Sequence, residues 1–89
     1  MKMTKIYKYE LPQISNIVKM PKNSSYMKFA MQNDIPHMWA AVTDSEVMET
    51  WEIKFLMTGD EVRDEDGVYM NTLFCDNGIV LHVFGRKIL

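Results

Sequence analysis

Cysteine, glycine and proline are scarce in this chain, which has one Cys, four Gly and three Pro among 89 residues. The single Cys75 excludes an internal disulfide framework, and its place in a strand pattern predicts a buried apolar residue. No apolar run approaches the roughly 20 residues of a membrane-spanning helix. The first five residues carry charge but lead into no apolar stretch of a secretory signal. We therefore expect a cytoplasmic protein.

The sequence also lacks any recognisable catalytic signature, phosphate-binding loop or metal motif. His37 and His82 are too few for a zinc site without help from Cys75 or carboxylates. Nothing in the sequence brings those three residues together, although such a cluster remains an alternative. Acid–base catalysis by His82 would need a paired carboxylate or nucleophile, and none is evident. We expect a non-enzymatic protein without cofactor or metal, in which His82 is a hydrogen-bonded structural residue.

Charge is unevenly distributed, although the formal net charge is only −2. Residues 1–28 contain six lysines and one acid, whereas residues 29–89 contain four bases and eleven acids. Such a polarised chain can orient a partner or stack head to tail with itself. In a β-sheet protein, distant segments interleave, and we expect the polarity to cancel in space.

Seven short runs of β-type residues, separated by turn signals, are the main pattern that the chain does contain. They span residues 5–11, 16–20, 26–32, 36–43, 50–57, 68–75 and 79–84. Asn33-Asp34 and Asp76-Asn77-Gly78 predict hairpin turns, and a short helical turn is an option over Ser45–Glu49. The pattern predicts a single all-β domain over residues 1–89, either a compact antiparallel sandwich or a small half-open barrel.

The longest irregular segment, residues 58–67, is rich in carboxylates, which are the ligands that hard cations require. Its acids are Asp60, Glu61, Asp64, Glu65 and Asp66. An EF-type calcium loop fails here, because Val62 stands two positions before Asp64 and no bidentate Glu follows Gly67 at the right distance. A solvated acidic turn is the preferred reading, with a weak cation site or an acidic contact surface for a partner as alternatives.

Lysines alternate with aromatic residues near the start, at Lys5-Ile-Tyr-Lys-Tyr9, a pattern typical of nucleic-acid binding. In a strand, however, Tyr7 and Tyr9 point away from Lys8, and a pI near 5.6 gives no overall attraction to phosphate. We therefore disfavour nucleic acid, and we also weigh an acidic phosphate-like surface over residues 44–66. Tyr7, Tyr9, His37 and the acidic loop are the candidate contact residues.

Several short motifs resemble a family of short, uncharacterised bacteriophage and prophage proteins. They are Ile6-Tyr-Lys-Tyr-Glu-Leu-Pro12, Met20-Pro21, Gln32-Asn33, Trp39-Ala40, Thr58-Gly59 and His82-Val-Phe84. The resemblance covers nearly the whole chain and implies a phage origin and a life in the host cytoplasm, but no activity. Many members carry a Gly-Thr-Gly-His-like step where this chain has Met57-Thr-Gly-Asp60, so a role for that histidine does not carry over.

These observations favour a non-enzymatic accessory protein, active in host takeover or against host defence, that acts by stoichiometric contact with a host or phage protein. The alternative is an oligomeric sponge that sequesters a small nucleotide through Lys8, Lys19, Lys28 or Arg86. A structural or virion-associated role comes third. A homo-oligomer is a reasonable expectation, because a core of this size is thin, and no membrane is expected as a partner.

Overall fold

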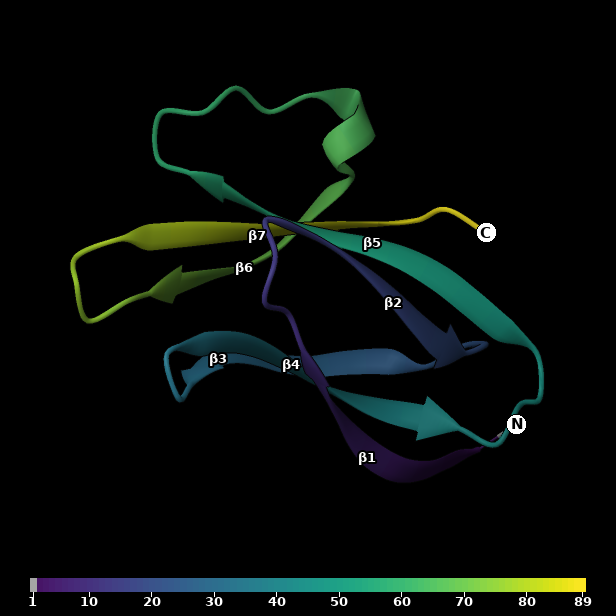
Figure 1. Cartoon of the computed structure of the whole chain (residues 1–89). Helices are drawn as coiled ribbons and strands as arrows, with labels where there is room; N and C mark the ends of the chain where they lie inside the picture. The colour runs from purple at the N-terminus through teal and green to yellow at the C-terminus, as the bar shows by residue number, and fades with distance from the viewer. Residues whose placement is uncertain (1) are drawn as a thin grey trace.

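The computed structural model describes residues 2–89 and shows seven strands in two antiparallel sheets (Figure 1). The strands are β1 (Met3–Glu10), β2 (Ser15–Pro21), β3 (Ser25–Gln32), β4 (Ile35–Thr43), β5 (Met48–Met57), β6 (Val68–Phe74) and β7 (Val80–Lys87). A 3₁₀ turn, η1 (Asp64–Asp66), precedes β6. The prediction of an all-β domain is confirmed, and the two sheets form an open sandwich instead of a closed barrel.

The first sheet, sheet A, has the strand order β1-β4-β3, and the second, sheet B, has the order β2-β5-β7-β6. The two predicted hairpins are present, because β3 pairs with β4 and β6 pairs with β7. Asn33 and Asp34 both have positive φ, at 53° and 62°, as a two-residue hairpin turn requires. The helical turn considered over Ser45–Glu49 is absent: that segment bends and then enters β5.

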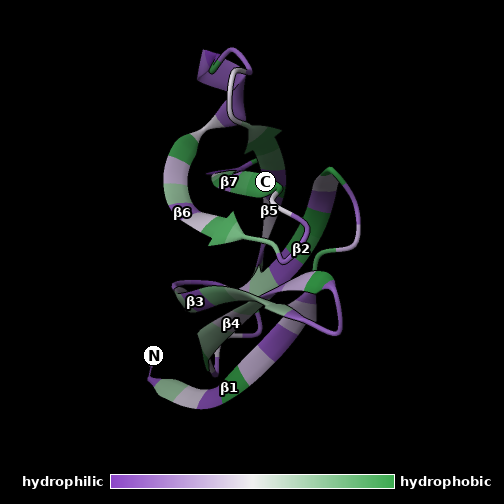
Figure 2. Cartoon of the chain, turned by 90° about the vertical axis from the view of Figure 1, so that its left-hand side faces the viewer, coloured by the Kyte–Doolittle hydropathy of each residue, from purple (hydrophilic) through white to green (hydrophobic). Residues whose placement is uncertain are grey.

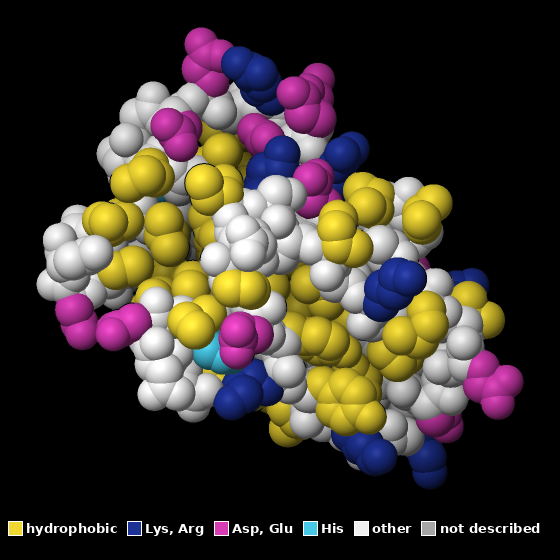
Figure 3. All heavy atoms as spheres, viewed as in Figure 1, with side chains coloured by type: hydrophobic (Ala, Val, Ile, Leu, Met, Phe, Trp, Pro, Cys, Tyr) yellow, Lys and Arg dark blue, Asp and Glu magenta, His cyan; other side chains and the backbone are white. Residues whose placement is uncertain are grey.

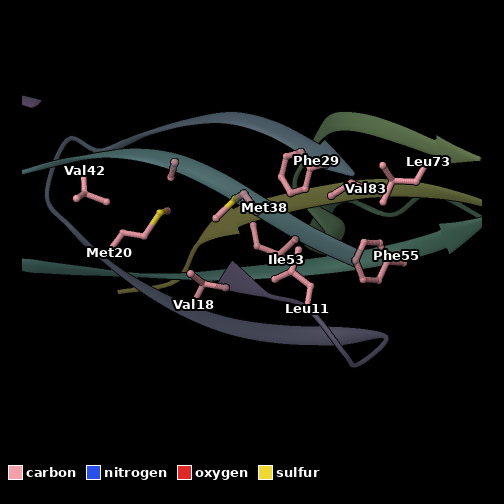
Figure 4. Close-up of a cluster of buried hydrophobic side chains, with 11 residues drawn as sticks. Leu11, Val18, Met20, Phe29, Met38, Val42, Ile53, Phe55, Leu73 and Val83 are labelled. Atoms are coloured by element: carbon pink, nitrogen blue, oxygen red, sulfur yellow. The ribbon is translucent and has the colours of Figure 1, made fainter. Parts of the chain in front are cut away.

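Alternate side chains of the two sheets meet in one core (Figure 4). The largest fully buried side chains are Leu11 in the link after β1, Met38 of β4, Ile53 of β5 and Val83 of β7. Phe29 of β3 and Leu73 of β6 extend the core toward the side where those two strands approach each other. The period-2 alternation of the sequence therefore does identify the buried face of each central strand.

Strand β1 lies apart from this core. It is the strand of sheet A farthest from sheet B, at the bottom of Figures 1 and 2. Contacts between the sheets run mainly from β3 to β6 and from β4 to β2. Seven of the eight residues of β1 are exposed, and only Tyr9 is half-buried. Sheet A therefore extends one strand beyond the cover of sheet B.

A glycine at position 67 allows the segment before β6 to lie against β7. Gly67 has φ 88° and ψ −144° and closes η1 through a hydrogen bond from its N–H to the Asp64 carbonyl, 3.2 Å away. A Cβ added at Gly67 would overlap the carbonyl group of Gly85 and lie 2.8 Å from Cβ of Arg86. The backbone can approach this closely because position 67 lacks a side chain, whereas a Cβ added at Gly85 would instead meet Met70 Sδ and Ile53 Cδ1.

Candidate functional site

Two adjoining hollows lie at the end of the sandwich where the two hairpin turns and the end of β5 meet. We call this surface the hairpin end, and Figure 2 looks onto it. The two hollows, of about 500 and 300 Å³, share Pro36 and Leu81. Their apolar lining includes Met31, Phe74 and Ile79 in the first hollow and Ile14, Phe55 and Met57 in the second. The hairpin end is thus a concave apolar surface.

Turn chemistry places charged residues at the edge of this surface. Asp34 lies in the β3–β4 turn and Asp76 in the β6–β7 turn, and both line the larger hollow. The second turn is held by hydrogen bonds from Gly78 N to the Cys75 carbonyl and from Cys75 N to the Ile79 carbonyl, 3.0 and 2.9 Å long. The two turns therefore place Asp34 and Asp76 beside the apolar side chains at the ends of the neighbouring strands.

The rim of the hairpin end is acidic. Asp34 and Asp76 line the larger hollow and Asp60 lines the smaller one, while no Lys, Arg or His among residues 2–89 lines either. Figure 3 shows hydrophobic side chains gathered at the left of the molecule with carboxylates above and below them. Phe74 is 77% exposed and Ile14 is 79% exposed. Exposed apolar area framed by charge of one sign is typical of a protein-interaction surface.

The predicted contact residues Tyr7 and Tyr9 lie on β1, away from the hairpin end. Their rings are 6.4 Å apart and face the side of sheet A that carries Met38 and Ala40. Partial burial, and then the neighbouring Tyr7, raise the pKa of Tyr9. Lys8 points to the opposite side, as predicted, so these rings and this charge do not form one platform.

His37 lies on that opposite side of sheet A and is 4% exposed. Its Nδ1 is 2.8 Å from the Ile35 carbonyl, and its Nε2 is 3.9 Å from a Glu10 carboxylate oxygen. Lys8 Nζ donates to Gln32 Oε1 at 2.8 Å, a hydrogen bond that joins β1 to β3 across β4. Because the strand register puts His37 beneath this bridge, the imidazole is covered and not presented to a partner.

The acidic loop divides into two parts. Asp60, Glu61, Asp64 and Glu65 are exposed, whereas Asp66 is buried, at 5% exposure. Lys54 Nζ donates to Asp66 Oδ1 at 2.9 Å, and Arg63 N donates to Asp66 Oδ2 at 2.8 Å. Asp66 therefore holds the loop onto sheet B. The prediction that Asp66 contacts a partner does not fit this buried position. Among residues 2–89, no group of three His, Cys, Asp or Glu is arranged to hold a metal ion.

The buried Asp66 predicts a loss of stability in acid. The hydrogen bond from Lys54, and then that from Arg63 N, hold the pKa of Asp66 below its usual range. A carboxylate whose pKa is lower in the folded state stabilises the protein above its unfolded-state pKa, roughly 4, and loses this effect as pH falls through the folded-state value. We expect Asp66→Asn to be less stable than wild type at pH 7 and to show a shallower fall in unfolding free energy below about pH 4.

Urea unfolding at a series of pH values checks this, with Asp64→Asn as the control, since Asp64 is an exposed acid in the same turn. The control should follow the wild type. Identical pH dependence in the wild type and Asp66→Asn would show that the Lys54–Asp66 pair contributes nothing.

The structure also places His82 and Cys75, the two other residues considered for a zinc site. His82 Nε2 lies 2.9 Å from Thr58 Oγ1 and its Nδ1 lies 3.1 Å from Thr72 Oγ1, so the prediction of a hydrogen-bonded structural histidine is confirmed. Cys75 is half-buried in the lining of the larger hollow, less enclosed than predicted. His37, on sheet A, is hydrogen-bonded at Ile35 and takes no part in either environment.

Direct pairing does not neutralise the polarity of the sequence. The four bases of residues 29–89 all form ion pairs with acids of that same part of the chain. Among residues 2–89, none of the six lysines before residue 29 lies within 4.0 Å of a carboxylate oxygen. Sheet pairing nevertheless brings the two parts of the chain together, and a hydrogen bond from the Asn23 backbone and, less strongly, the charge of Lys22 lower the pKa of Glu49. Cancellation of the polarity in space therefore stays a prediction.

Sequence reasoning missed the hairpin end, because its residues come from four separate segments. Asp34 and Asp76 are distant in sequence and meet only because sheets A and B end at the same side. The available signal was Phe74 beside a turn, at the last position of β6, where the side chain stays 77% exposed although Val80 stands opposite it.

Comparison with known proteins adds the family. The searches of curated proteins and of solved structures find no match, and among residues 2–89 no helix has the length and apolar character needed to cross a membrane. One family model, described as a domain of unknown function (DUF7352), matches residues 3–88. Because that match spans all seven strands, the chain belongs to the DUF7352 family.

Proposed function

We propose that this domain is a non-enzymatic binding protein that acts by stoichiometric contact, and that the hairpin end is its contact surface. The observation that carries the proposal is the pair of adjoining apolar hollows, which share Pro36 and Leu81 and whose charged lining, among residues 2–89, is acidic. Apolar surface of this kind gains free energy when a partner removes it from water.

The lining defines the chemistry of the partner. Phe74 and Ile79 need apolar side chains against them, and Asp34, Asp60 and Asp76 attract lysine or arginine at the periphery. A segment with an apolar centre and basic flanks meets both requirements. An acidic segment would place like charges together, which disfavours binding by a partner of the wrong sign.

Phage origin and action on the host belong to the same proposal. The terminal motifs, Ile6-Tyr-Lys-Tyr-Glu-Leu-Pro12 and His82-Val-Phe84, resemble proteins of phages and prophages. A small factor that acts by contact would take a host protein, including a component of a defence system, as its partner.

The test is capture of partners from bacterial lysate by the tagged wild type and by two matched variants. Phe74→Lys removes the most exposed aromatic side chain of the hairpin end and adds the disfavoured charge. Ile17→Lys makes the same kind of change at an apolar residue of β2 that is 60% exposed and lines neither hollow. We expect the captured amount of a specific partner to fall at least about tenfold with Phe74→Lys and to stay unchanged with Ile17→Lys.

Titration with a synthetic peptide makes the outcome independent of the host. A peptide with a Leu-Phe centre and flanking lysines should shift the backbone amide signals of residues 74–81, and its version with glutamates should not. Equal capture by both variants, together with shifts outside the hairpin end, would contradict the proposal.

A second candidate function, sequestration of a small nucleotide, is favoured by one row of sheet A. Lys8 and Lys28 stand opposite Trp39 on either side, so an aromatic ring lies between two cations. Lys19 lies on β2, and Arg86 Nε donates to Glu52 Oε1 at 3.0 Å, so these two do not join the row. A cyclic-nucleotide panel should raise the melting temperature if this function is present, since ligand at 100 times its Kd adds about 2.7 kcal/mol to stability.

A further inference from the structure

Strand β1 has one edge that no other strand formed by residues 2–89 uses. It is the terminal strand of sheet A and pairs only with β4 in that sheet. The Leu11 N–H donates to the Pro36 carbonyl at 2.9 Å. Because backbone groups of an antiparallel strand alternate in direction, Tyr7 and Tyr9 direct their N–H and C=O groups toward β4. Ile6, Lys8 and Glu10 direct theirs away from the sheet.

The open edge of β1 is regular, as is that of β2, which pairs with β5 without a break, whereas the other two edge strands are interrupted. Its pairing with β4 runs without a break from Lys5 to Glu10, and the register shift lies before Lys5. The edge strand β3 shifts register between Tyr26 and Lys28, and β6 does so between Tyr69 and Asn71. Bulges of this kind protect an edge from further pairing, and residues 5–10 have none.

The side chains of β1 determine which strand can be added. Lys5 and Lys8 form no ion pair in the part of the chain that the structure describes. Lysines on an edge repel a strand that brings further positive charge and accept one that brings carboxylates. Within residues 2–89, the one hydrogen bond of the Lys8 ammonium goes to the neutral amide of Gln32, and a carboxylate would make a stronger, charge-assisted bond.

We infer that β1 is a docking edge for an extended acidic segment of a partner protein, which adds to sheet A as a fourth strand. This surface is separate from the hairpin end and takes a partner segment of the opposite charge. Main-chain hydrogen bonds to Ile6, Lys8 and Glu10 give affinity, as in other cases of strand addition. Ile6 and Tyr7, 62% and 45% exposed, offer apolar cross-strand contacts on the two faces.

The register specifies the spacing of the acids. Lys5 pairs with Val42 and faces the core side of sheet A, whereas Lys8 pairs with Trp39 and faces the other side. A strand that places a carboxylate next to each lysine needs two acidic residues three positions apart, one on each face of the sheet. An acidic helix presents side chains at helical spacing and exposes no backbone donors, so it cannot satisfy the same edge.

Amide hydrogen exchange with a defined probe tests the inference. The probe is a synthetic peptide rich in Val and Thr that carries two Asp three positions apart, and its control has Lys in place of Asp. Saturating acidic peptide should slow exchange of the Ile6, Lys8 and Glu10 amides at least about tenfold. The amides of Tyr7 and Tyr9, already bonded to β4, should change little. Absence of protection at millimolar peptide would overturn the inference.

Two variants separate edge pairing from simple charge attraction. Ile6→Pro removes an N–H that makes no bond to β4, so the fold is retained, and we expect peptide binding to fall at least about tenfold. If Ile6→Pro fails to fold, the double variant Lys5→Glu, Lys8→Glu serves instead, and it should prefer the Lys peptide. Tight binding of an oligo-dT strand without protection of the three amides would identify a phosphate surface and contradict strand addition.

Discussion

Replacement of Met38 by alanine is expected to lower the free energy of unfolding by about 2–5 kcal/mol. Met38 is fully buried at the centre of β4, the middle strand of sheet A, and belongs to the cluster that joins both sheets. Truncation removes apolar contacts and leaves a cavity that strands paired on both sides cannot easily close. For a small domain this is a large part of a total stability of about 5–15 kcal/mol.

Urea unfolding measured by fluorescence of the two tryptophans checks this prediction. Met27→Ala is the matched control, because Met27 lies at the bulge of β3 and is 55% exposed. It should change stability by less than about 0.5 kcal/mol. Similar losses in the two variants would mean that Met38 is not packed as described.

Gly67→Ala should cost about 2–4 kcal/mol. Two effects add together: the φ of 88° and ψ of −144° are accessible to glycine almost alone, and the new methyl group would overlap the carbonyl of Gly85. The overlap is with backbone, so β7 or the loop must move, which also disturbs the ion pair between Lys54 and Asp66, the residue immediately before Gly67.

Gly59→Ala separates the two effects, because Gly59 has φ 100° but no atom within 4 Å of an added Cβ. It should show the backbone cost alone, about 1 kcal/mol. Thermal unfolding of the two variants beside the wild type gives the comparison. If Gly59→Ala proved as damaging as Gly67→Ala, the contact between the η1 segment and β7 would not be the cause.

Local chemistry explains why so much of this fold can be predicted from the sequence. Asn33-Asp34 and Asp76-Asn77-Gly78 dictate tight turns, so both hairpins follow, and alternation in residues 50–57 identifies Ile53 and Phe55 as core. Strand order between distant segments carries no such signal. Nothing in the periodicity of residues 5–11 indicates that they pair with β4, or that residues 16–20 pair with β5.

The candidate surfaces were harder to predict than the fold, because they depend on that distant pairing. Tyr7 was a sound candidate for exposure, since it is 45% exposed. Asp66 was not, because only the folded loop brings Lys54 to it. His37 was among the predicted contact residues, and its own segment gives no sign of burial. The side chains that cover it, Lys8 and Gln32, belong to the two strands on either side of β4.

The strand order also governs how the chain must fold during synthesis. Glu10 pairs with His37 and Met3 with Thr43, so β1 leaves the ribosome well before its partner exists. The paired residues are 27 (37 − 10) to 40 (43 − 3) positions apart, and at about 5–20 residues per second this interval takes roughly one to eight seconds. The lysines of β1 keep this waiting strand soluble and apart from the same strand of neighbouring nascent chains. Charge that distinguishes partners in the folded protein thus also protects the unfinished one.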